Sequence, residues 1–473
     1  MESLKEARDQ DPYPFFADRL ARGPVHWDEG MNAWIVVGYE ECRYIQLNED
    51  LFAHPYFELK GAADVYGGPK GVLLLQGEQH HRVHNFLLQH FTPTTVRKYR
   101  TAFIAELVSA RLDAIEGRTH VDLAAEFASV VPSDVIAALL GLDWRDEELM
   151  AKCRRWNSTM FRWTETFGED EEAYAEAAAA ASALNEVLLP VIRARRDEPR
   201  DDLISVLWEQ GQGVLEQWGE EEILAQARVL FFAGTDTTAH FLKNAIHTLL
   251  NHPELQDRIR GDERQIVAFG EEVLRYLAPV QFRVRVATRD VEVAGRLIAK
   301  GDRVHPVNGA ANRDPRQFHH PETVDLDRGN LKTHVAFNVG PRYCVGAALS
   351  RGEEVEVISQ LLDRYGTLRW DRDAEPARYR GYMPRSFSPL NAVVAPAEEA
   401  APATATATAT ATVSADADAC VGAGNCVLVA PSVFGLDDDG AVAVLRERIG
   451  AADRAAADAA AAGCPAAAII VED

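Results

Sequence analysis

Cys344 stands in a short loop with a glycine on either side, Phe337-Asn-Val-Gly340-Pro-Arg342-Tyr-Cys344-Val-Gly346, directly before an alanine-rich helical pattern. A cysteine at a helix N-terminus faces the positive end of the helix dipole. We therefore expect nearby N–H groups and Arg342 to lower the pKa of the thiol and to favour the thiolate, the form that binds metals. A lone cysteine is more often a small core hydrophobe, but Gly340 and Gly346 leave room for a flat group.

The same residues resemble the signature Phe-x-x-Gly-x-(His or Arg)-x-Cys-x-Gly of the cytochrome P-450 superfamily of haem-thiolate monooxygenases, with Asn338 where glycine is more common. The resemblance implies that Cys344 is the axial ligand of the iron of haem b, and that Phe337 and Gly346 contact the cofactor. It also implies a mainly α (α+β) fold, in which a long central helix lies over the haem beside a small β-sheet region.

The stretch Ala233-Gly234-Thr235-Asp236-Thr237-Thr238 puts a glycine and a polar cluster inside a long apolar helical pattern. This is costly unless a ligand or bound water needs them there. A surface turn is the alternative, but phenylalanines on both sides favour burial. The motif resembles the oxygen-binding segment of P-450 enzymes, which implies that Gly234, next to Ala233, leaves room for dioxygen. Asp236 and Thr237 would then be the acid and the alcohol that deliver protons.

Haem carries two propionates, which need cationic or hydrogen-bonding partners at the ring edge. Arg285, Arg342 and His80 occupy the matching positions of the family, and their alternative interpretation is solvated surface charge. His84 stands where the family has arginine. Histidine is a shorter, titratable donor, so we expect this propionate to be held less firmly or in a pH-dependent way.

Glu272 and Arg275 place opposite charges three residues apart on one helical face, which is most often a weak surface ion pair. Their resemblance to the Glu-x-x-Arg pair of P-450 enzymes implies instead a buried pair that organises the segment behind the haem, assisted by Arg328. We assign this pair to the fold and not to the chemistry.

Composition narrows the class of protein. The chain has 473 residues, 47% hydrophobic and 26% charged, with a formal net charge of -24, which argues against nucleic acid and anionic membranes as partners. The N-terminus has no apolar signal segment, and no stretch reaches the ~20 apolar residues of a membrane span. Six cysteines in so long a chain do not indicate a disulfide scaffold. We expect a cytoplasmic protein and a monomer.

An alanine- and threonine-rich run after Pro396 divides the chain. We interpret 396–412 as a flexible linker between a haem domain, 1–395, and a small module, 413–473, because the run has no large apolar face to bury. The alternative is an edge strand. In the large module, helical periodicity covers 121–141, 170–197, 219–251 and 264–277, and strand-like pieces lie at 33–38, 285–297 and 302–306.

The small module carries Cys420-Val-Gly-Ala-Gly-Asn-Cys426 and, further on, Cys464-Pro. Zinc is disfavoured, because the module has no histidine and no Cys-x2-Cys spacing. The residues resemble small bacterial ferredoxins of α+β fold, with Ala423 in place of the middle cysteine. This resemblance implies a 3Fe-4S cluster held by Cys420, Cys426 and Cys464, and the alternative is a 4Fe-4S cluster with a non-cysteine fourth ligand.

Together these resemblances imply a monooxygenase that hydroxylates, or otherwise oxidises, a small to medium apolar organic substrate with dioxygen. The fused ferredoxin is the expected electron donor. No Gly-x-Gly-x-x-Gly fingerprint follows a strand, so a separate ferredoxin reductase with FAD and NAD(P)H is the expected partner. Alternatives are desaturation, ring coupling or bond cleavage by the same haem chemistry, and a non-enzymatic haem sensor or electron carrier, which would have no need of Asp236 and Thr237.

Two surfaces are predicted with less support from motifs. Residues 396–473 carry twelve acidic and three basic side chains, so this tail is a candidate to dock on basic residues. These candidates are Arg82, Arg97, Lys98, Arg100 and Arg351, and solvation alone is their simpler interpretation. Candidate substrate-lining residues are Phe57, Phe232, Val280, Phe282 and Phe387. The alternative for each is an ordinary core position, where residues of these types are found more often.

Overall fold

The computed structural model describes residues 2–55, 61–166, 170–381, 383–396, 411–416, 419–420, 426–427, 430, 433–436, 441–462, 464, 466 and 468–472. The chain divides into two compact units, Met1–Pro396 and Ala397–Asp473, and each is described by itself.

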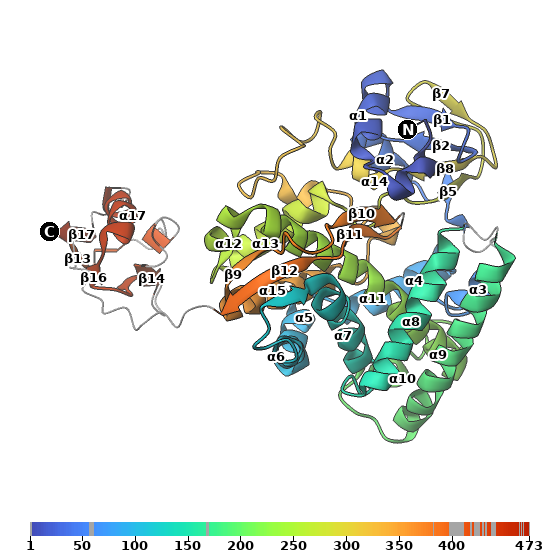
Figure 1. Cartoon of the computed structure of the whole chain (residues 1–473), viewed down its shortest axis with the longest axis horizontal. Helices are drawn as coiled ribbons and strands as arrows, with labels where there is room; N and C mark the ends of the chain where they lie inside the picture. The colour runs from blue at the N-terminus through green and yellow to red at the C-terminus, as the bar shows by residue number, and fades with distance from the viewer. Residues whose placement is uncertain are drawn as a thin grey trace. The chain divides into compact units, whose positions relative to one another are not determined.

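The first unit is mainly helical (Figure 1). Its α-helices are α1 (Tyr13–Arg22), α2 (Tyr39–Leu47), α3 (Ala62–Val65), α4 (Gly77–Gln89), α5 (Pro93–Tyr99), α6 (Ala105–Asp113), α7 (Val131–Leu139), α8 (Glu147–Thr164), α9 (Glu171–Asp197), α10 (Leu203–Gln210), α11 (Glu220–Asn251), α12 (Pro253–Ile259), α13 (Glu263–Tyr276), α14 (Asn308–Ala311) and α15 (Ala347–Arg364). Short turns of 3-10 or π-helix are η1 (Leu4–Asp9), η3 (Arg100–Ile104), η4 (Ala124–Ala128), η5 (Leu331–Thr333) and η6 (Gly340–Arg342).

The strands of this unit form small sheets at its edge. One sheet has the order β1-β2-β8-β5-β3, in which only β2 and β8 run parallel, and another has the order β4-β12-β9. The strands are β1 (Val25–Asp28), β2 (Ala33–Val36), β3 (Phe52–Ala53), β4 (His120–Asp122), β5 (Arg285–Ala287), β6 (Val291–Val293), β7 (Arg296–Ile298), β8 (Arg303–Pro306), β9 (Tyr365–Trp370), β10 (Arg378–Gly381), β11 (Arg385–Ser388) and β12 (Asn391–Pro396). The pairs β6–β7 and β10–β11 are two-stranded hairpins.

Helix α11 is the central element of the unit. It begins with three glutamates, whose charges suit the positive end of the helix dipole, and Glu222 accepts a 3.0 Å hydrogen bond from the Gly219 N–H. It ends before Pro253, which starts α12. It packs against α7, α8, α9, α13 and α15, so it is buried along most of its length. This position suits the long central helix that the sequence predicted.

Three of the four predicted helices are confirmed, as α9, α11 and α13. The prediction of one helix over 121–141 is wrong, because this range contains part of β4, then η4 and α7. Val121 pairs with Ala392 in the sheet, and Pro132 starts a new helix in its first turn.

The strand-like pieces at 33–38 and 302–306 are confirmed as β2 and β8. The piece at 285–297 is three short strands, because a turn separates β6 from β7. Ala294 and Gly295 make that turn with φ values of +47° and +75°.

Helix α9 also differs from expectation. By length and composition alone it is the single helix among the described residues that is apolar enough to cross a membrane. The sequence predicted no such stretch, and the alanines of α9 account for the difference. α9 packs against α8, α10 and α11, as a core helix does, so its hydropathy is weak evidence for a span.

The second unit contains a sheet of order β16-β13-β17, a hairpin β14–β15 and helix α17. Its elements are β13 (Ala411–Ala415), β14 (Phe434–Leu436), β15 (Val442–Val444), β16 (Arg448–Ile449), α17 (Ala451–Ala462) and β17 (Ile469–Glu472). β13 begins inside the range expected for the linker, because Ala411 and Thr412 pair with β16. The rest of the Ala-Thr run lies outside the described residues.

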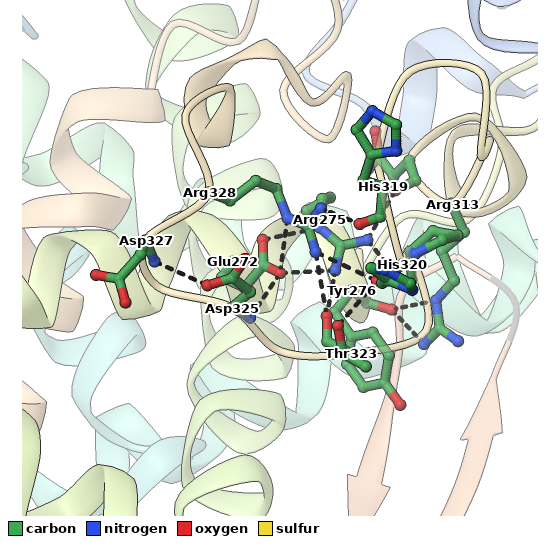
Figure 2. A network of polar contacts seen from close by, with 12 residues as sticks. Glu272, Arg275, Tyr276, Arg313, His319, His320, Thr323, Asp325, Asp327 and Arg328 are labelled. Carbon is green, nitrogen blue, oxygen red and sulfur yellow. Dashed lines mark hydrogen bonds and ion pairs between the residues drawn. The ribbon is translucent and has the colours of Figure 1, made fainter.

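A buried ion-pair network fixes the loop between α14 and η5 (Figure 2). Arg275 donates to both oxygens of Glu272 over 2.7 and 2.8 Å, and Arg328 donates to Glu272 over 3.1 Å. Arg275 also donates to the backbone carbonyls of Asn312, Pro321 and Thr323. This confirms the structural pair predicted from Glu-x-x-Arg, including the part of Arg328.

Substituting Glu272→Ala leaves two buried guanidinium groups without their carboxylate. We expect the free energy of unfolding to fall by about 3–5 kcal/mol. All eight tryptophans lie in residues 1–396, so tryptophan fluorescence during denaturant unfolding of the full chain reports on this unit alone. The control is Asp18→Ala, which breaks an exposed pair with Arg22 and should cost under ~1 kcal/mol. Equal losses for both variants would contradict the structural role of Glu272.

Candidate active site

The loop that carries Cys344 is held by its backbone. Cys344 lies between η6 and α15, and its N–H donates to the Phe337 carbonyl over 2.9 Å. Gly340 has a φ of +73°, and a Cβ at this position would lie 3.0 Å from Leu47 Cδ2. Only glycine satisfies both this backbone and this close packing, so the loop presents the sulfur in one position.

Asn338, the departure from the family signature, adopts a left-handed backbone with φ of +60°. Glycine adopts this conformation freely, and asparagine is among the side chains that tolerate it best. Asn338 Oδ1 also accepts from Arg283 Nε over 2.9 Å, and its Nδ2 donates to the Arg342 carbonyl over 3.2 Å. The asparagine therefore adopts this backbone with two hydrogen bonds, one to Arg283 in the segment before β5 and one within the loop itself.

A cavity that opens to solvent lies between this loop and α11, with a volume of about 250 Å³. It brings together most of the residues singled out from the sequence. These are His80, His84, Ala233, Gly234, Thr237, Arg285, Phe337, Arg342, Cys344 and Gly346. Asp236 is the predicted site residue of this unit that does not line it.

The electrostatics of Cys344 correct one expectation. Burial raises the pKa of its thiol. Arg283 and the backbone N–H groups of Gly346 and Ala347 lower this pKa, but by less than burial raises it. The sequence predicted a lowered pKa from the helix end and Arg342. Arg342 instead pairs with Glu49 over 2.6 Å, and its charge is not among those that act on Cys344. The raised pKa favours the neutral thiol, and a cation bound beside the sulfur would favour the thiolate.

One corner of the cavity is basic. His54, Arg283, Arg285 and Arg342 meet there, and burial followed by these three arginines holds the pKa of His54 well below its usual value. Burial also lowers the pKa of His80 to about 3, and its Nδ1 is buried without a hydrogen-bond partner among the described residues. An anionic group such as a haem propionate would satisfy this corner.

His84 has a contact that the sequence did not predict. Its Nε2 lies 2.7 Å from the carbonyl oxygen of Tyr343, the residue before Cys344, so this nitrogen carries the proton and donates. Burial lowers the pKa of His84, so the ring is neutral near pH 7. Where the family has an arginine for a haem propionate, this chain has the neutral His84, whose hydrogen bond to Tyr343 joins α4 to the cysteine loop.

The oxygen-binding motif lies on α11 with its polar groups divided between two faces. The Thr237 hydroxyl lines the cavity and donates to the Ala233 carbonyl over 2.6 Å. A Cβ at Gly234 would lie 2.6 Å from Ile136 Cδ1. Any side chain at position 234 would therefore clash with Ile136, and Gly234 and Ile136 both line the cavity.

Asp236 points away from the cavity toward α8. Burial raises the pKa of its carboxyl to about 6, although a hydrogen bond from Asn157 and the charge of Lys243 both lower it. A carboxyl with this pKa holds or releases a proton near neutral pH, which suits a general acid.

Sequence reasoning missed several residues of the cavity. His54 belongs to no sequence motif that would have marked it as a site residue. Arg283 could have been predicted, because it stands two residues before Arg285 and would point to the same side of an extended segment. Glu353 lines the cavity from α15, and burial raises its pKa well above the usual value. Among the predicted substrate-lining residues, Val280 does line the cavity.

The aromatic members of that prediction are placed elsewhere, apart from Phe57, which lies outside the described residues. Phe232 stacks on Phe161 with ring centroids 4.1 Å apart, and Phe387 stacks on His247 at 3.4 Å. Phe282 is buried in a separate core.

The cysteines of the second unit surround one small core. Cys426 is buried in it, and Cys420 and Cys464 pack against it. All three are free thiols. The N–H groups of Val442 and Ala468 donate to the sulfurs of Cys420 and Cys464 over 3.3 Å each. Free thiols that accept backbone hydrogen bonds are the donor set of an iron-sulfur cluster.

The role of Asn338 gives a prediction. Asn338→Gly loses two hydrogen bonds but relaxes the backbone, so its free energy of unfolding should change by less than ~1 kcal/mol. Asn338→Val adds a β-branched side chain at positive φ and should cost at least ~2 kcal/mol. Denaturant unfolding followed by tryptophan fluorescence measures both. A valine variant as stable as the glycine variant would show that the loop has another backbone conformation.

Comparison with known proteins agrees with this site. The family model "Cytochrome P450" matches residues 26–378, and the model "4Fe-4S single cluster domain of Ferredoxin I" matches residues 415–471. The chain is 29% identical over 364 residues to the biotin biosynthesis cytochrome P450 of Bacillus subtilis (strain 168), covering 76% of this chain and 90% of that protein. It is 30% identical over 376 residues to the cytochrome P450 monooxygenase PikC of Streptomyces venezuelae, covering 76% and 85%.

A solved structure shows the same fold. The crystal structure of P450BioI in complex with hexadec-9Z-enoic acid ligated acyl carrier protein has a TM-score of 0.74 and 28% identity, over 82% of this chain and 99% of that one. Haem fits the cavity, because the accessible Cys344 sulfur, the basic corner and the unpartnered His80 nitrogen are the groups that it needs. The chain therefore belongs to the cytochrome P450 family of haem-binding oxidoreductases and carries a ferredoxin-like domain at its C-terminal end.

Proposed function

We propose that this protein is a monooxygenase that inserts one atom of dioxygen into a small to medium apolar organic substrate, with electrons from its own ferredoxin domain. The observation that carries the proposal is that Cys344, from the cysteine loop, and Thr237, from α11, line the same cavity. Cys344 would hold the haem iron, and the basic corner with His80 would hold the propionates. Bound there, haem supplies the redox chemistry of dioxygen activation.

The residues of the chain supply protons and exclude water. Thr237 reaches the cavity with a hydroxyl that both accepts and donates a hydrogen bond. Asp236, one residue before it, has a pKa of about 6, so it can take up and release a proton near neutral pH and pass it to the hydroxyl side of α11 through solvent or a side-chain rotation. Val72, Leu87, Ile136 and Val229 give the cavity apolar walls, which keeps competing water out and favours an apolar substrate.

The small domain supports the electron-transfer part of the proposal. We propose a 3Fe-4S cluster on Cys420, Cys426 and Cys464, because Ala423 removes the fourth thiolate. We further propose residues 1–395 as the haem domain, 396–412 as the linker and 413–473 as the ferredoxin domain, although strand β13 already begins at Ala411. The electrons would come from NAD(P)H through a separate flavin-containing ferredoxin reductase, in the cytoplasm.

The first test is to find the substrate. A titration of the purified, haem-loaded protein against a chemically diverse set of apolar compounds, followed at the ferric Soret band, detects displacement of water from the iron. A saturable low-spin to high-spin shift with one class of compound supports the proposal. The absence of a shift with every compound would favour a sensor or an electron carrier.

The hydroxyl of Thr237 has a matched control on the same helix. Thr235 makes the same hydrogen bond to the carbonyl four residues back, over 2.7 Å, but it is buried away from the cavity. Thr237→Val should lower the product formed per NADPH by roughly tenfold or more and raise peroxide, because protons no longer reach dioxygen. Thr235→Val should change it less than ~2-fold. Equal effects of the two variants would remove the proton-delivery role.

The cluster type is tested by iron and acid-labile sulfide analysis of the full chain. The wild type should contain about three non-haem iron ions for every four sulfides, and Ala423→Cys should raise this to about four by restoring the fourth ligand. Cys426→Ala should lose most of the sulfide. A wild-type ratio of about four to four would replace the 3Fe-4S assignment with a 4Fe-4S cluster.

A further inference from the structure

After its first two turns, helix α11 is mostly buried. From Ala225 to Leu250, the partly exposed residues are Ala233, Gly234, Asp236, Thr237, His240, Lys243 and His247. Ala233, Gly234 and Thr237 line the cavity. At about 100° per residue, Asp236, His240, Lys243 and His247 lie within roughly 60° of one another on one face. Asn251 extends this face to the exposed C-terminal end of the helix. We call Asp236, His240, Lys243, His247 and Asn251 the polar stripe.

Such a row is unusual, because ionisable side chains are rarely buried and cost free energy where they are. The fold alone does not account for it. His240 Nδ1 is buried without a hydrogen-bond partner among the described residues, and an unsatisfied group of this kind is destabilising. Burial, with the charge of Lys243, holds the pKa of His240 well below its usual value, so the ring is a neutral donor and acceptor.

Charged and polar groups from the neighbouring elements complete the stripe. Asn157 from α8 hydrogen-bonds Asp236, and Asp122 from β4 and Asp236 both favour the charged form of Lys243. At the far end, the Asn251 amide donates to His247 Nε2 over 3.1 Å.

The His247 end of the stripe is also held in place. The His247 ring stacks on Phe387 of β11 at 3.4 Å and 4°, and His252 faces it as a further titratable group. The stripe therefore runs along one face of α11 from Asp236, the neighbour of the cavity-lining Thr237, to the exposed Asn251.

We propose that the polar stripe supplies protons from the exposed C-terminal end of α11 to Asp236, and that His240 and Lys243 position and pass them. This rests on the proton-delivery role proposed above for Asp236 and Thr237. Asp236 gives its proton toward Thr237 and becomes a carboxylate. The Lys243 ammonium replaces that proton through His240, which takes it on one ring nitrogen and releases it from the other. The Lys243 amine then regains a proton from solvent at the His247 and Asn251 end, and no electron moves along the stripe.

The shapes and acidities of the groups agree with this order. Lysine side chains on a helix lean toward its N-terminus, which aims Lys243 at His240 and Asp236. Burial lowers the pKa of Lys243, so its ammonium gives up a proton more readily than an exposed one. Asp236, His240, Lys243 and His247 are partly exposed and Asn251 is exposed, so bridging waters can complete the steps between these side chains.

The test needs no known substrate. The full-length protein, loaded with haem and cluster, is supplied with a separate ferredoxin reductase, NADPH and dioxygen. Two electrons and two protons convert dioxygen to hydrogen peroxide, and four of each convert it to two waters. Peroxide formed per NADPH consumed therefore reports proton supply. We expect Lys243→Met and His240→Leu to lower the share of NADPH that ends in water by roughly tenfold. We also expect a larger solvent isotope effect in D₂O.

A second lysine variant separates proton transfer from charge. Lys243→Arg keeps the positive charge but does not release its proton near neutral pH. We expect it to be as defective as Lys243→Met, and we expect the fall in water formation at alkaline pH, where wild-type Lys243 loses its proton, to disappear in both. Full recovery with arginine would show that Lys243 acts only through its charge and would overturn the proposal.

The controls separate this inference from the proposed function. Thr248→Val, on α11 but off the stripe, should behave as wild type. If Thr237→Val diverts electrons to peroxide while the stripe variants do not, the stripe is wrong and the proposed function stands. If Thr237→Val also has no effect, the proton-delivery role itself fails. Should His240→Leu fail to bind haem, His240→Gln keeps a hydrogen-bonding side chain without titrating, and wild-type behaviour of that variant would equally overturn the role of His240.

Discussion

The active site depends on one constraint, the burial of a sulfur that must carry charge. Cys344 is half-buried in the cavity wall, and desolvation raises the pKa of its thiol more than Arg283 and the N–H groups at the start of α15 lower it. A bare thiolate is therefore disfavoured in this cavity, and a bound metal cation is what makes it stable. The cavity therefore needs its cofactor to balance its charges. The basic corner, with the His80 nitrogen that has no hydrogen-bond partner among the described residues, suits the anionic propionates of the same haem.

The surrounding structure keeps this sulfur in place without touching it. The Glu272, Arg275 and Arg328 network is buried and fixes the loop that leads to the cysteine segment. Asn338 and Gly340 hold that segment in left-handed backbone conformations. His84 then ties α4 to the Tyr343 carbonyl. Each of these contacts uses the backbone of the loop, so the geometry at the sulfur is set by several independent elements.

The positions of many site residues could be predicted from the sequence, because these residues belong to short motifs. Cys344, Thr237 and Arg285 line one cavity because motif spacing reflects local backbone, and local backbone is what a sequence specifies best. Long periodic helices such as α11 were predictable for the same reason. The break of 121–141 into β4, η4 and α7 was not, because it depends on pairing with Ala392, far along the chain.

The misses in the site have a similar cause. His54 reaches the basic corner, and Ile136 fills the space beside Gly234, through tertiary packing that no local pattern reports. The pKa of Cys344 was predicted from its helix end, but desolvation by the whole cavity outweighs that local field. The polar stripe of α11 was visible as spacing, yet its meaning needed the knowledge that every neighbouring residue is buried.

The central claim is that dioxygen is split at the Cys344 cavity with electrons that pass through the chain's own iron-sulfur domain. The most direct measurement is the mass of the product formed under ¹⁸O₂ by the full chain, with a ferredoxin reductase and NADPH but no added ferredoxin, acting on the compound that gives the largest spin shift. The account predicts a product that gains one ¹⁸O atom. A product without label, or one formed only when a separate ferredoxin is added, would contradict it.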